Sequence, residues 1–417
     1  MQNTPSPTEG VSSARQLGAF ERMYYRYEQR HTMNFMVAAE FMELITVDRV
    51  VSALKAAQRR HPLLRACIED DAAIGPEFRF PEHAPEVELR VVHLDHRNWN
   101  SVAAENFTNK IDNASPTLMR ATLVSGGEGS TILLQFSHVI ADGMSAIFIL
   151  EDIVASLNGN ALKALPTPPS QEQLIAALLP EIDASILADL PAPSPEMAAW
   201  VAFEPEVDKT PHVSTCTLDA ELTAKIVSRC RAEETTVQGL LVAAFSQVYS
   251  AHRSQDFVRV VTPINFRSLI GERRDSANYI TAARTGSTPL DGSSIWDQAR
   301  ALNEELIIPR SNVGVTIGSM AIRHFLPSSA SSEMVEGFMN SQLAHEMQVS
   351  NLGVLNFARS GPIYPAAVWG PMLLLNIAGE ANSGITTFED RLHIVTSSRV
   401  VDKKFLDDVQ EILTESV

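Results

Sequence analysis

The chain has 417 residues, of which 45% are hydrophobic, so it is long enough to bury two cores of about 200 residues each. Its net charge of −17 argues against a nucleic-acid-binding protein, because the average field repels phosphates. No apolar run reaches the roughly 18 residues that a membrane span needs, so we expect no membrane span.

The N-terminus and the cysteines indicate the compartment. Residues 1–16 are expected to form a disordered arm, because the chain begins with polar residues and prolines and lacks an apolar signal segment. The three cysteines are odd in number and lack the spacing of a disulfide framework, which fits a reducing environment: Cys67, Cys216 and Cys230. We therefore expect a cytoplasmic protein.

The first motif follows an amphipathic helix. Apolar residues recur at helical spacing from Val50 to Ala57, and the segment 59–65 then has the sequence Arg-Arg-His-Pro-Leu-Leu-Arg. The helix must end near His61, because the residue before a proline disfavours helical backbone. We interpret His61 as structural.

The second motif is the segment 136–143, with the sequence Phe-Ser-His-Val-Ile-Ala-Asp-Gly. Residues 131–136 are β-branched or apolar with almost no alternation, which predicts a strand buried on both faces. From Met144 to Leu157 the apolar residues recur at helical spacing, and Gly159 follows as a stop signal. A strand, a tight turn and a helix therefore follow in order, an arrangement that presents side chains at the strand end to a crevice.

His138 is the candidate catalytic residue of this turn. Near neutral pH an imidazole accepts a proton from a hydroxyl, an amine or a thiol, as general-base catalysis requires. Asp142 is expected to point inward, and a buried carboxylate needs a cation, so an arginine elsewhere is expected to pair with it. We expect Gly143 to close the turn with dihedrals that other residues resist.

Two other interpretations of this motif exist. A histidine at a strand end is often only structural. His138 and Asp142, four residues apart, could also be two metal ligands. However, no second group of histidines, cysteines or carboxylates has ligand spacing, so we expect no metal.

Proline-rich segments divide the chain. The segments 165–170 and 190–195 enclose one helix-like stretch, residues 173–179. We therefore predict an N-terminal lobe over residues 17–164, a linker over 165–212 and a C-terminal lobe over 213–417.

The C-terminal lobe is predicted to mix strands and helices. Strands are expected at 215–218 and 257–261, the second leading into a Pro-Ile-Asn-Phe-Arg segment at 263–267. Helices are expected from Asp219, over 236–249 and over 404–413. The segments 372–377 and 392–396 are expected to be paired strands.

Taken together, these motifs resemble the superfamily of non-ribosomal peptide condensation domains and CoA-dependent acyltransferases. The resemblance rests on four sequence features: the Arg-His-Pro-Leu-Leu-Arg run, the His-x-x-x-Asp-Gly turn, the Asn-x-Arg element at 265–267 and a Ser-Asn-x-Gly segment at 350–353. The superfamily includes the BAHD enzymes, the fungal alcohol acetyltransferases and the polyketide-associated acyltransferases. The resemblance implies an α/β fold of two chloramphenicol-acetyltransferase-like lobes in a V, with the active site in a tunnel at their junction.

The resemblance also implies roles for single residues. His138 would be the general base, Gly143 the turn residue and Asp142 an ion-pair partner. Arg267 and Arg65 compete for that partnership, and we favour Arg267. Asn265, Ser350 and Asn351 would be substrate contacts, although Asn351 could equally hold a loop.

The chain departs from the family pattern at three points. Ser137 stands where many condensation domains carry a second histidine, as in the alcohol-acylating branches. The segment 367–371 is a poor match to the Asp-Phe-Gly-Trp-Gly run of the BAHD branch, so we do not expect membership of that branch. The chain ends soon after its last predicted helix, which favours a freestanding protein over a synthetase module.

We therefore expect an acyltransferase that moves an acyl group from acyl-CoA or an acyl carrier protein to a hydroxyl of a small-molecule acceptor, expected to be a secondary metabolite. No tightly bound cofactor is expected, since the thioester of CoA or phosphopantetheine is a co-substrate. An amide-forming condensation enzyme and a non-catalytic scaffold that binds a carrier are the alternatives. A hydrolase that uses the His/Asp pair is not expected, because the chain lacks a Gly-x-Ser-x-Gly nucleophile elbow.

Overall fold

The computed structural model describes residues 14–71, 73–112, 115, 117–187, 192–199, 209–375 and 377–417. Residues 1–13 of the expected disordered arm lie outside this range. For residues 14–16 the expectation of disorder is wrong, because they form strand β1 (Ala14–Gln16), antiparallel to β4 (Gly75–Arg79). The guanidinium of Arg15 holds this strand in place by pairing with Glu21 and by lying over the ring of Phe78.

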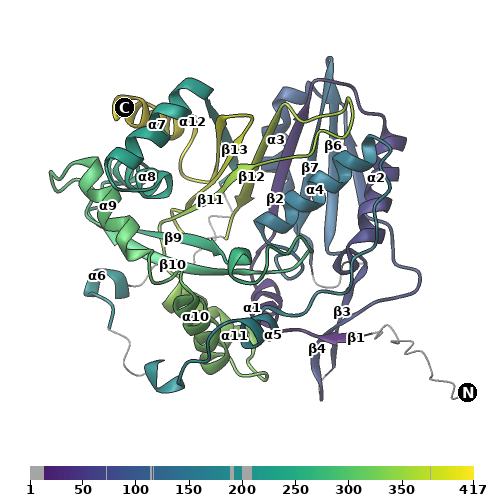
Figure 1. The fold of residues 1–417 in the computed structure, drawn as a ribbon, viewed down its shortest axis with the longest axis horizontal. Coiled ribbons are helices and arrows are strands. Elements are labelled where there is room, and N and C mark those ends of the chain that lie inside the picture. The colour runs from purple at the N-terminus through teal and green to yellow at the C-terminus, as the bar shows by residue number, and fades with distance from the viewer. Residues whose placement is uncertain are drawn as a thin grey trace, which may run out of the picture.

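The N-terminal lobe is built on a five-stranded sheet in the order β12-β2-β7-β6-β5. The four strands from this lobe are β2 (Phe35–Phe41), β5 (Glu88–Val92), β6 (Met119–Gly126) and β7 (Gly129–Phe136). Every residue of β7 is buried, as its continuous apolar run predicts. Helices α2 (Val47–Arg60) and α4 (Gly143–Leu157) lie together along one face of the sheet, and α3 (Trp99–Asn106) lies on the opposite face (Figure 1).

The C-terminal lobe is built on a six-stranded sheet in the order β10-β9-β11-β13-β14-β8. Its strands are β8 (His212–Leu218), β9 (Val258–Asn265), β10 (Ile280–Ser287), β11 (Met347–Leu355), β13 (Ala381–Phe388) and β14 (Arg391–Ser398). Helices α7 (Ala220–Ala232), α8 (Val237–Arg253), α9 (Ile295–Glu305) and α12 (Lys403–Glu415) cover the side of the sheet that faces away from the N-terminal lobe (Figure 1). The apolar face of α8 makes the centre of this core.

One strand crosses between the lobes. Strand β12 (Ala367–Leu373) pairs antiparallel with β2 and so completes the N-terminal sheet, although it follows β11 in the chain. The expected pairing of residues 372–377 with 392–396 is therefore wrong. Strand β14 pairs with β13 and β8 instead, because the apolar character of these segments predicts strands but not their partners. The lobe boundaries that we drew from the proline-rich segments stay a prediction.

Shorter elements fill the space below the two sheets in Figure 1. Helices α1 (Ala19–Glu28), α5 (Gln171–Leu178), α10 (Asn312–Phe325) and α11 (Ser332–Gln342) gather there, and a small sheet of β1, β4 and β3 (Cys67–Asp71) extends beside them. Short helix α6 (Pro195–Ala198) lies at the periphery. The largest apolar cluster includes residues of both lobes, such as Phe136, Phe266 and Met339. Within the described ranges, no helix has the length and apolar content to cross a membrane.

Candidate active site

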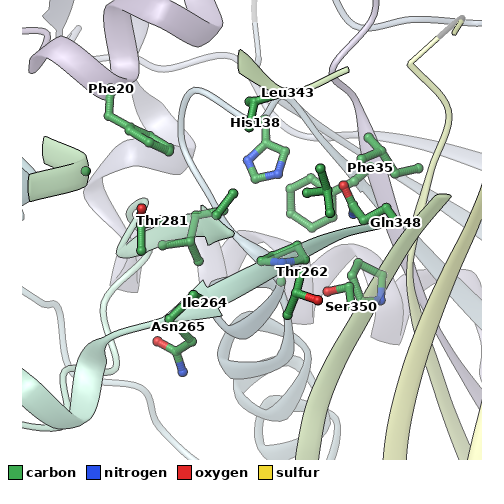
Figure 2. Close-up of a pocket in the computed structure, with 18 of the residues that line it drawn as sticks. Phe20, Phe35, His138, Thr262, Ile264, Asn265, Thr281, Leu343, Gln348 and Ser350 are labelled. Carbon is green, nitrogen blue, oxygen red and sulfur yellow. The ribbon is translucent and has the colours of Figure 1, made fainter. Parts of the chain in front are cut away.

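A cavity of about 640 Å³ lies between the two lobes. Its size is within the range of small-molecule sites, about 300–1,000 Å³. Figure 2 shows the ring of His138 pointing into this cavity, with Thr262, Gln348 and Ser350 on the strands of the opposite lobe. Helix α1, the loop that carries His138 and the start of α4 line one side, and β9, β10, β11, α10 and α11 line the other. The imidazole is therefore accessible from a space that both lobes enclose.

The turn after β7 carries His138 toward the cavity. Asp142 ends this turn and begins helix α4. Asp142 is the N-cap of α4, where its Oδ1 accepts a hydrogen bond from the backbone N of Ser145 at 2.8 Å. Such a cap satisfies one of the free N–H groups of the first turn. The Asp142 side chain is completely buried and points into the protein, as the sequence predicts. The residues between the strand and this cap form the loop that carries the imidazole.

Arg267, from the opposite lobe, is the cation that neutralises Asp142. Its Nη1 donates to Asp142 Oδ2 at 2.7 Å, and its Nη2 donates to Ser145 Oγ at 2.8 Å and to the Ala277 carbonyl at 3.1 Å. The guanidinium is 2% exposed and also lies over the ring of Tyr279. Removing one member of such a pair would leave an uncompensated buried charge. The geometry makes this pair a link between lobes rather than a proton donor to substrate.

Arg65 lies elsewhere. It ends the 3-10 turn Pro62–Arg65, and neither oxygen of Asp142 is bonded to it. His61, in the same motif, is fully buried with its Nε2 2.8 Å from Asp152 Oδ2. The Arg-His-Pro-Leu-Leu-Arg run therefore anchors α2 to α4 instead of facing the cavity.

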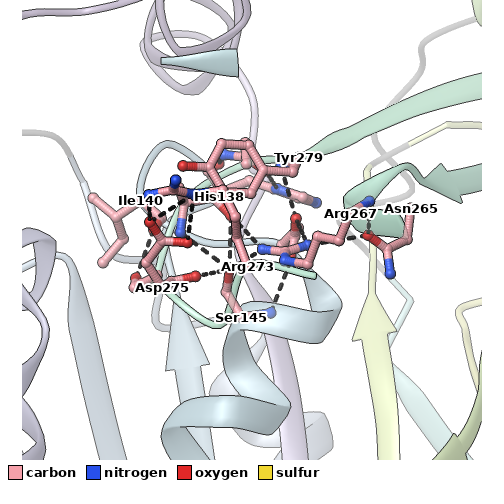
Figure 3. Close-up of polar contacts among 12 residues, drawn as sticks. His138, Ile140, Ser145, Asn265, Arg267, Arg273, Asp275 and Tyr279 are labelled. Carbon is pink, nitrogen blue, oxygen red and sulfur yellow. Dashed lines mark hydrogen bonds and ion pairs between the residues drawn. The ribbon is translucent and has the colours of Figure 1, made fainter. Parts of the chain in front are cut away.

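A segment of the C-terminal lobe, residues 275–279, fastens the loop that carries His138 (Figure 3). The Ser276 hydroxyl donates to the Ile140 carbonyl at 2.9 Å, and the Tyr279 backbone N donates to Asp142 Oδ2 at 2.8 Å. The side-chain amide of Asn278 donates to the His138 carbonyl. The loop that carries His138 is thus fixed by the opposite lobe at three points.

Asn278 also fixes the tautomer of His138. Because its Nδ2 donates to the His138 carbonyl, its Oδ1 is the atom that faces the ring, 3.2 Å from His138 Nδ1. An amide oxygen only accepts, so Nδ1 must carry the proton. The lone pair of the neutral ring is then on Nε2, the nitrogen that a general base needs.

Burial keeps this imidazole neutral. Desolvation lowers the pKa of His138, and it outweighs the opposing effect of the Asp142 charge. The ring stacks on Tyr24 at a centroid distance of 4.5 Å and contacts Phe35 at 4.8 Å, which holds it in one orientation. At neutral pH His138 is therefore an oriented, unprotonated base.

Gly143 matters to the site because it has no side chain. The expectation that it supplies unusual dihedrals is wrong, because Gly143 is the first residue of α4 and its φ is not positive. A Cβ at this position would lie 2.9 Å from Leu352 Cδ2 and 3.6 Å from Pro371 Cγ. Gly143 and Leu352 both line the cavity, so a side chain here would narrow it.

The three candidate substrate contacts all line the cavity: Asn265, Ser350 and Asn351. Two of them already have partners. Asn265 Oδ1 accepts from the backbone N of Arg267 at 3.1 Å and so supports the arginine, and Asn351 Oδ1 accepts from the Gly353 backbone N at 2.9 Å. The second bond closes the irregular part of β11. A role in substrate contact stays a prediction for each of them.

Sequence reasoning missed Asn278 and Glu28. Glu28 is the last residue of α1, and its carboxyl accepts hydrogen bonds from Ser137 Oγ at 2.8 Å and from the His138 backbone N at 3.2 Å. Neither residue belongs to a motif, and each is more than one hundred positions from His138. A polar residue within an otherwise apolar helix face was the available signal for Glu28. Among the described residues, no group of three or more histidines, cysteines or carboxylates is placed to hold a metal ion.

Comparison with known proteins supports the family resemblance that the sequence motifs indicate. The condensation-domain family matches residues 20–174, which contain α1 apart from its first residue, the whole N-terminal sheet except β12, and the His-x-x-x-Asp-Gly turn. The chain has the condensation-domain fold. The resemblance to the condensation-domain and acyltransferase superfamily, and the two-lobed α/β fold that it implies, are confirmed.

Solved structures with this fold cover nearly the whole chain. The trichothecene 15-O-acetyltransferase TRI3 from Fusarium sporotrichioides has a TM-score of 0.70 and 13% identity, covering 98% of this chain and 96% of that one. Polyketide synthase associated protein 5 from Mycobacterium tuberculosis has a TM-score of 0.68 and 15% identity, covering 97% of both chains.

The curated proteins that are similar to this chain in sequence are peptide synthetases. A plipastatin synthase polypeptide from Bacillus subtilis is 24% identical over 290 residues, which is 63% of this chain and 11% of that protein. Cyclosporin synthetase from Tolypocladium inflatum is 22% identical over 280 residues, 58% of this chain and 2% of that protein. The chain thus spans only a small part of these relatives. The family match and the solved structures establish the fold of this chain.

Proposed function

We propose that this protein is an acyltransferase that moves an acyl group from a thioester to a hydroxyl of a small-molecule acceptor, with His138 as the general base. One observation carries the proposal. His138 lines a cavity between the lobes, its imidazole is neutral, and the contact of Nδ1 with Asn278 leaves the lone pair on Nε2. This is the arrangement that deprotonation of a bound nucleophile requires.

The reaction would proceed without a covalent enzyme intermediate. The acceptor hydroxyl gives its proton to His138 Nε2 as its oxygen attacks the thioester carbonyl carbon. The tetrahedral oxyanion collapses and breaks the carbon–sulfur bond, and the leaving sulfur takes the proton from the imidazolium. An ester and a free thiol result, and His138 returns to its neutral form. Holding both substrates in one cavity supplies much of the rate.

The Asp142–Arg267 pair would act through structure. It joins the start of α4, where the loop that carries His138 ends, to the Asn-x-Arg element of the opposite lobe. Its task in the proposal is to keep the two walls of the cavity in register, so that acceptor and donor meet at the imidazole.

The donor is proposed to be acyl-CoA or an acyl-phosphopantetheine carried by a carrier protein. Arg310 supports this choice. Among the described residues that line the cavity it is the only lysine or arginine, it is half-buried, and its guanidinium has no carboxylate partner within the described parts of the chain. Burial without such a partner lowers its pKa, and a phosphate of either donor would compensate the charge.

Amide formation is the second candidate. The relatives in sequence are peptide synthetases, and the same base could deprotonate an amine. Ester formation is favoured because Ser137 replaces the second histidine, as in the alcohol-acylating branches, and its hydroxyl is bonded to Glu28 away from the cavity. A cytoplasmic location and a secondary-metabolite acceptor belong to the same proposal.

Thiol release tests the proposal directly. The protein is incubated with a panel of acyl-CoA thioesters and acyl-carrier proteins, with alcohol and amine acceptors, and free thiol and product mass are recorded. Acceptor-dependent thiol release with an ester product supports the proposal, and an amide product with carrier donors only supports the second candidate. Binding of a carrier with no turnover in any pair would instead indicate a scaffold.

A further inference from the structure

Glu28 is a buried carboxyl directly behind the catalytic loop. Its side chain accepts three hydrogen bonds: from Ser137 Oγ at 2.8 Å, from the His138 backbone N at 3.2 Å and from Asn34 Nδ2 at 3.4 Å. The residue is 4% exposed. None of these contacts belongs to the proton transfer described above, so the function of this carboxyl needs its own explanation.

Glu28 lacks the ion pair that compensates the other buried carboxyl of the site. Asp142 has Arg267, whereas no lysine, arginine or histidine of the described chain forms a salt bridge with Glu28. The charged and titratable groups around it are Tyr24 on its own helix, His138 on the loop and the more distant Lys110 from the segment before β6.

Burial raises the pKa of Glu28 to about 7, against the opposing effects of its hydrogen bonds to Ser137, His138 and Asn34 and of the Lys110 charge. Its carboxyl therefore changes charge in the neutral range, where the enzyme would work.

The hydrogen bonds of Glu28 determine the backbone on both sides of the catalytic residue. Ser137 Oγ, which donates to Glu28, also accepts from the Val139 backbone N at 3.2 Å. The carboxyl thus controls the N–H groups of His138 and, through Ser137, of Val139. All three direct contacts use Glu28 as the acceptor, so each is strongest when the carboxyl is ionised and both of its oxygens only accept.

We propose that Glu28 is a positioning residue for the transfer reaction, whose ionised carboxyl holds the Ser137–His138 peptide so that the imidazole faces the cavity. This inference rests on the proposed function. Protonation of Glu28 removes its charge and turns one of its two oxygens into a donor, which weakens the contacts to the loop and lets the ring leave the productive orientation. Transfer then slows on the acid side of neutrality before His138 itself is protonated.

The test is Glu28→Gln, which keeps the shape of the side chain and removes its charge. We expect kcat to fall by about 10- to 100-fold with KM unchanged, since a misplacement on the order of 1 Å is enough for such a loss. We also expect the midpoint of the acid limb of kcat to move from near pH 7 in the wild type to below pH 6.5, where His138 alone titrates. Ser137→Ala, which removes one of the three contacts, should give a smaller loss of kcat.

Glu21→Gln is the matched control. Glu21 is also a buried carboxyl of α1, but it pairs with Arg15 and caps the start of the helix, about two turns from Glu28. This variant should lose stability and keep the kcat profile of the wild type. A Glu28→Gln enzyme with wild-type kcat and an unchanged acid limb would overturn the inference.

A readout without turnover separates this inference from the proposed function. The ring signals of His138, assigned with His138→Asn, are followed by NMR against pH. A second inflection near pH 7 that disappears in Glu28→Gln supports the coupling, even if no donor and acceptor pair reacts. A single inflection in both proteins overturns the coupling. Absence of turnover with every donor and acceptor pair counts against the proposed function only.

Discussion

Asn278 Oδ1 lies 3.2 Å from His138 Nδ1, although the two residues belong to opposite lobes. One lobe therefore supplies the base and the other decides which of its nitrogens carries the proton. This relationship makes the tautomer of His138, and with it the proposed proton transfer, depend on how the two lobes are joined.

Replacement of Asn278 should change the base without removing it. In Asn278→Asp a carboxylate would face Nδ1 and stabilise the imidazolium, so the pKa of His138 should rise. In the Glu28→Gln background, where His138 alone sets the acid limb of kcat, that limb should move to higher pH. In Asn278→Leu the tautomer is no longer fixed, and we expect kcat to fall by about tenfold or more with little change in KM. The pH profiles of both variants measure this effect. Identical profiles in Glu28→Gln with and without Asn278→Asp would contradict the assignment.

The Asp142–Arg267 pair should matter for stability more than for chemistry. Asp142→Ala leaves the Arg267 cation buried without a partner, and such losses cost about 3–5 kcal/mol. Soluble yield should drop accordingly. The double variant Asp142→Ala with Arg267→Met should lose less than the sum of the single variants, because no charge is left behind. Denaturant unfolding of the three proteins gives the coupling, and additive losses would show that the pair is not a unit.

The raised pKa of the Glu28 carboxyl should make the stability of the protein depend on pH. The pKa of this carboxyl is about 7 in the folded protein and 4.5 when unperturbed. Between pH 4.5 and pH 7 the carboxyl of Glu28 is therefore protonated in the folded protein and ionised in the unfolded chain. The free energy of unfolding is highest below pH 4.5, and it falls by about 3 kcal/mol as the pH rises to 7. Glu28→Gln should be free of this loss. The difference in unfolding free energy between Glu28→Gln and wild type should grow over that window, and a constant difference would contradict the folded pKa.

Arg310 should distinguish donors by charge. Arg310→Ala should raise KM for acyl-CoA and for acyl-phosphopantetheine by about tenfold, the value of one charge-assisted hydrogen bond. KM for an acyl N-acetylcysteamine thioester, which has no phosphate, should not change. Arg323→Ala, on the exposed side of α10 in the same region, is the control. Equal changes for all donors would show that Arg310 shapes the wall and does not bind phosphate.

The local parts of the site could be predicted from sequence. A continuous apolar run predicts the buried strand β7, and the following turn and helical spacing place His138 at its end. An inward carboxylate predicts a cationic partner, and the Asn-x-Arg element offers Arg267.

Long-range parts could not be predicted in the same way. Asn278 and Glu28 reach His138 only through the packing of a distant loop and helix, which no local pattern specifies. The same holds for β12, whose partner is decided by the free edge of β2. The role of Gly143 depends on the neighbouring Leu352, and its position in the turn suggested a backbone reason instead.

Single-turnover thiol release by His138→Ala tests the central claim most directly. With a donor and acceptor that the wild type uses, we expect the rate to fall by about 10²- to 10⁴-fold, the usual contribution of a general base, while the unfolding transition and binding of both substrates persist. Release of thiol and formation of ester at the wild-type rate by this variant would show that the imidazole is not the base, and would contradict the proposed mechanism.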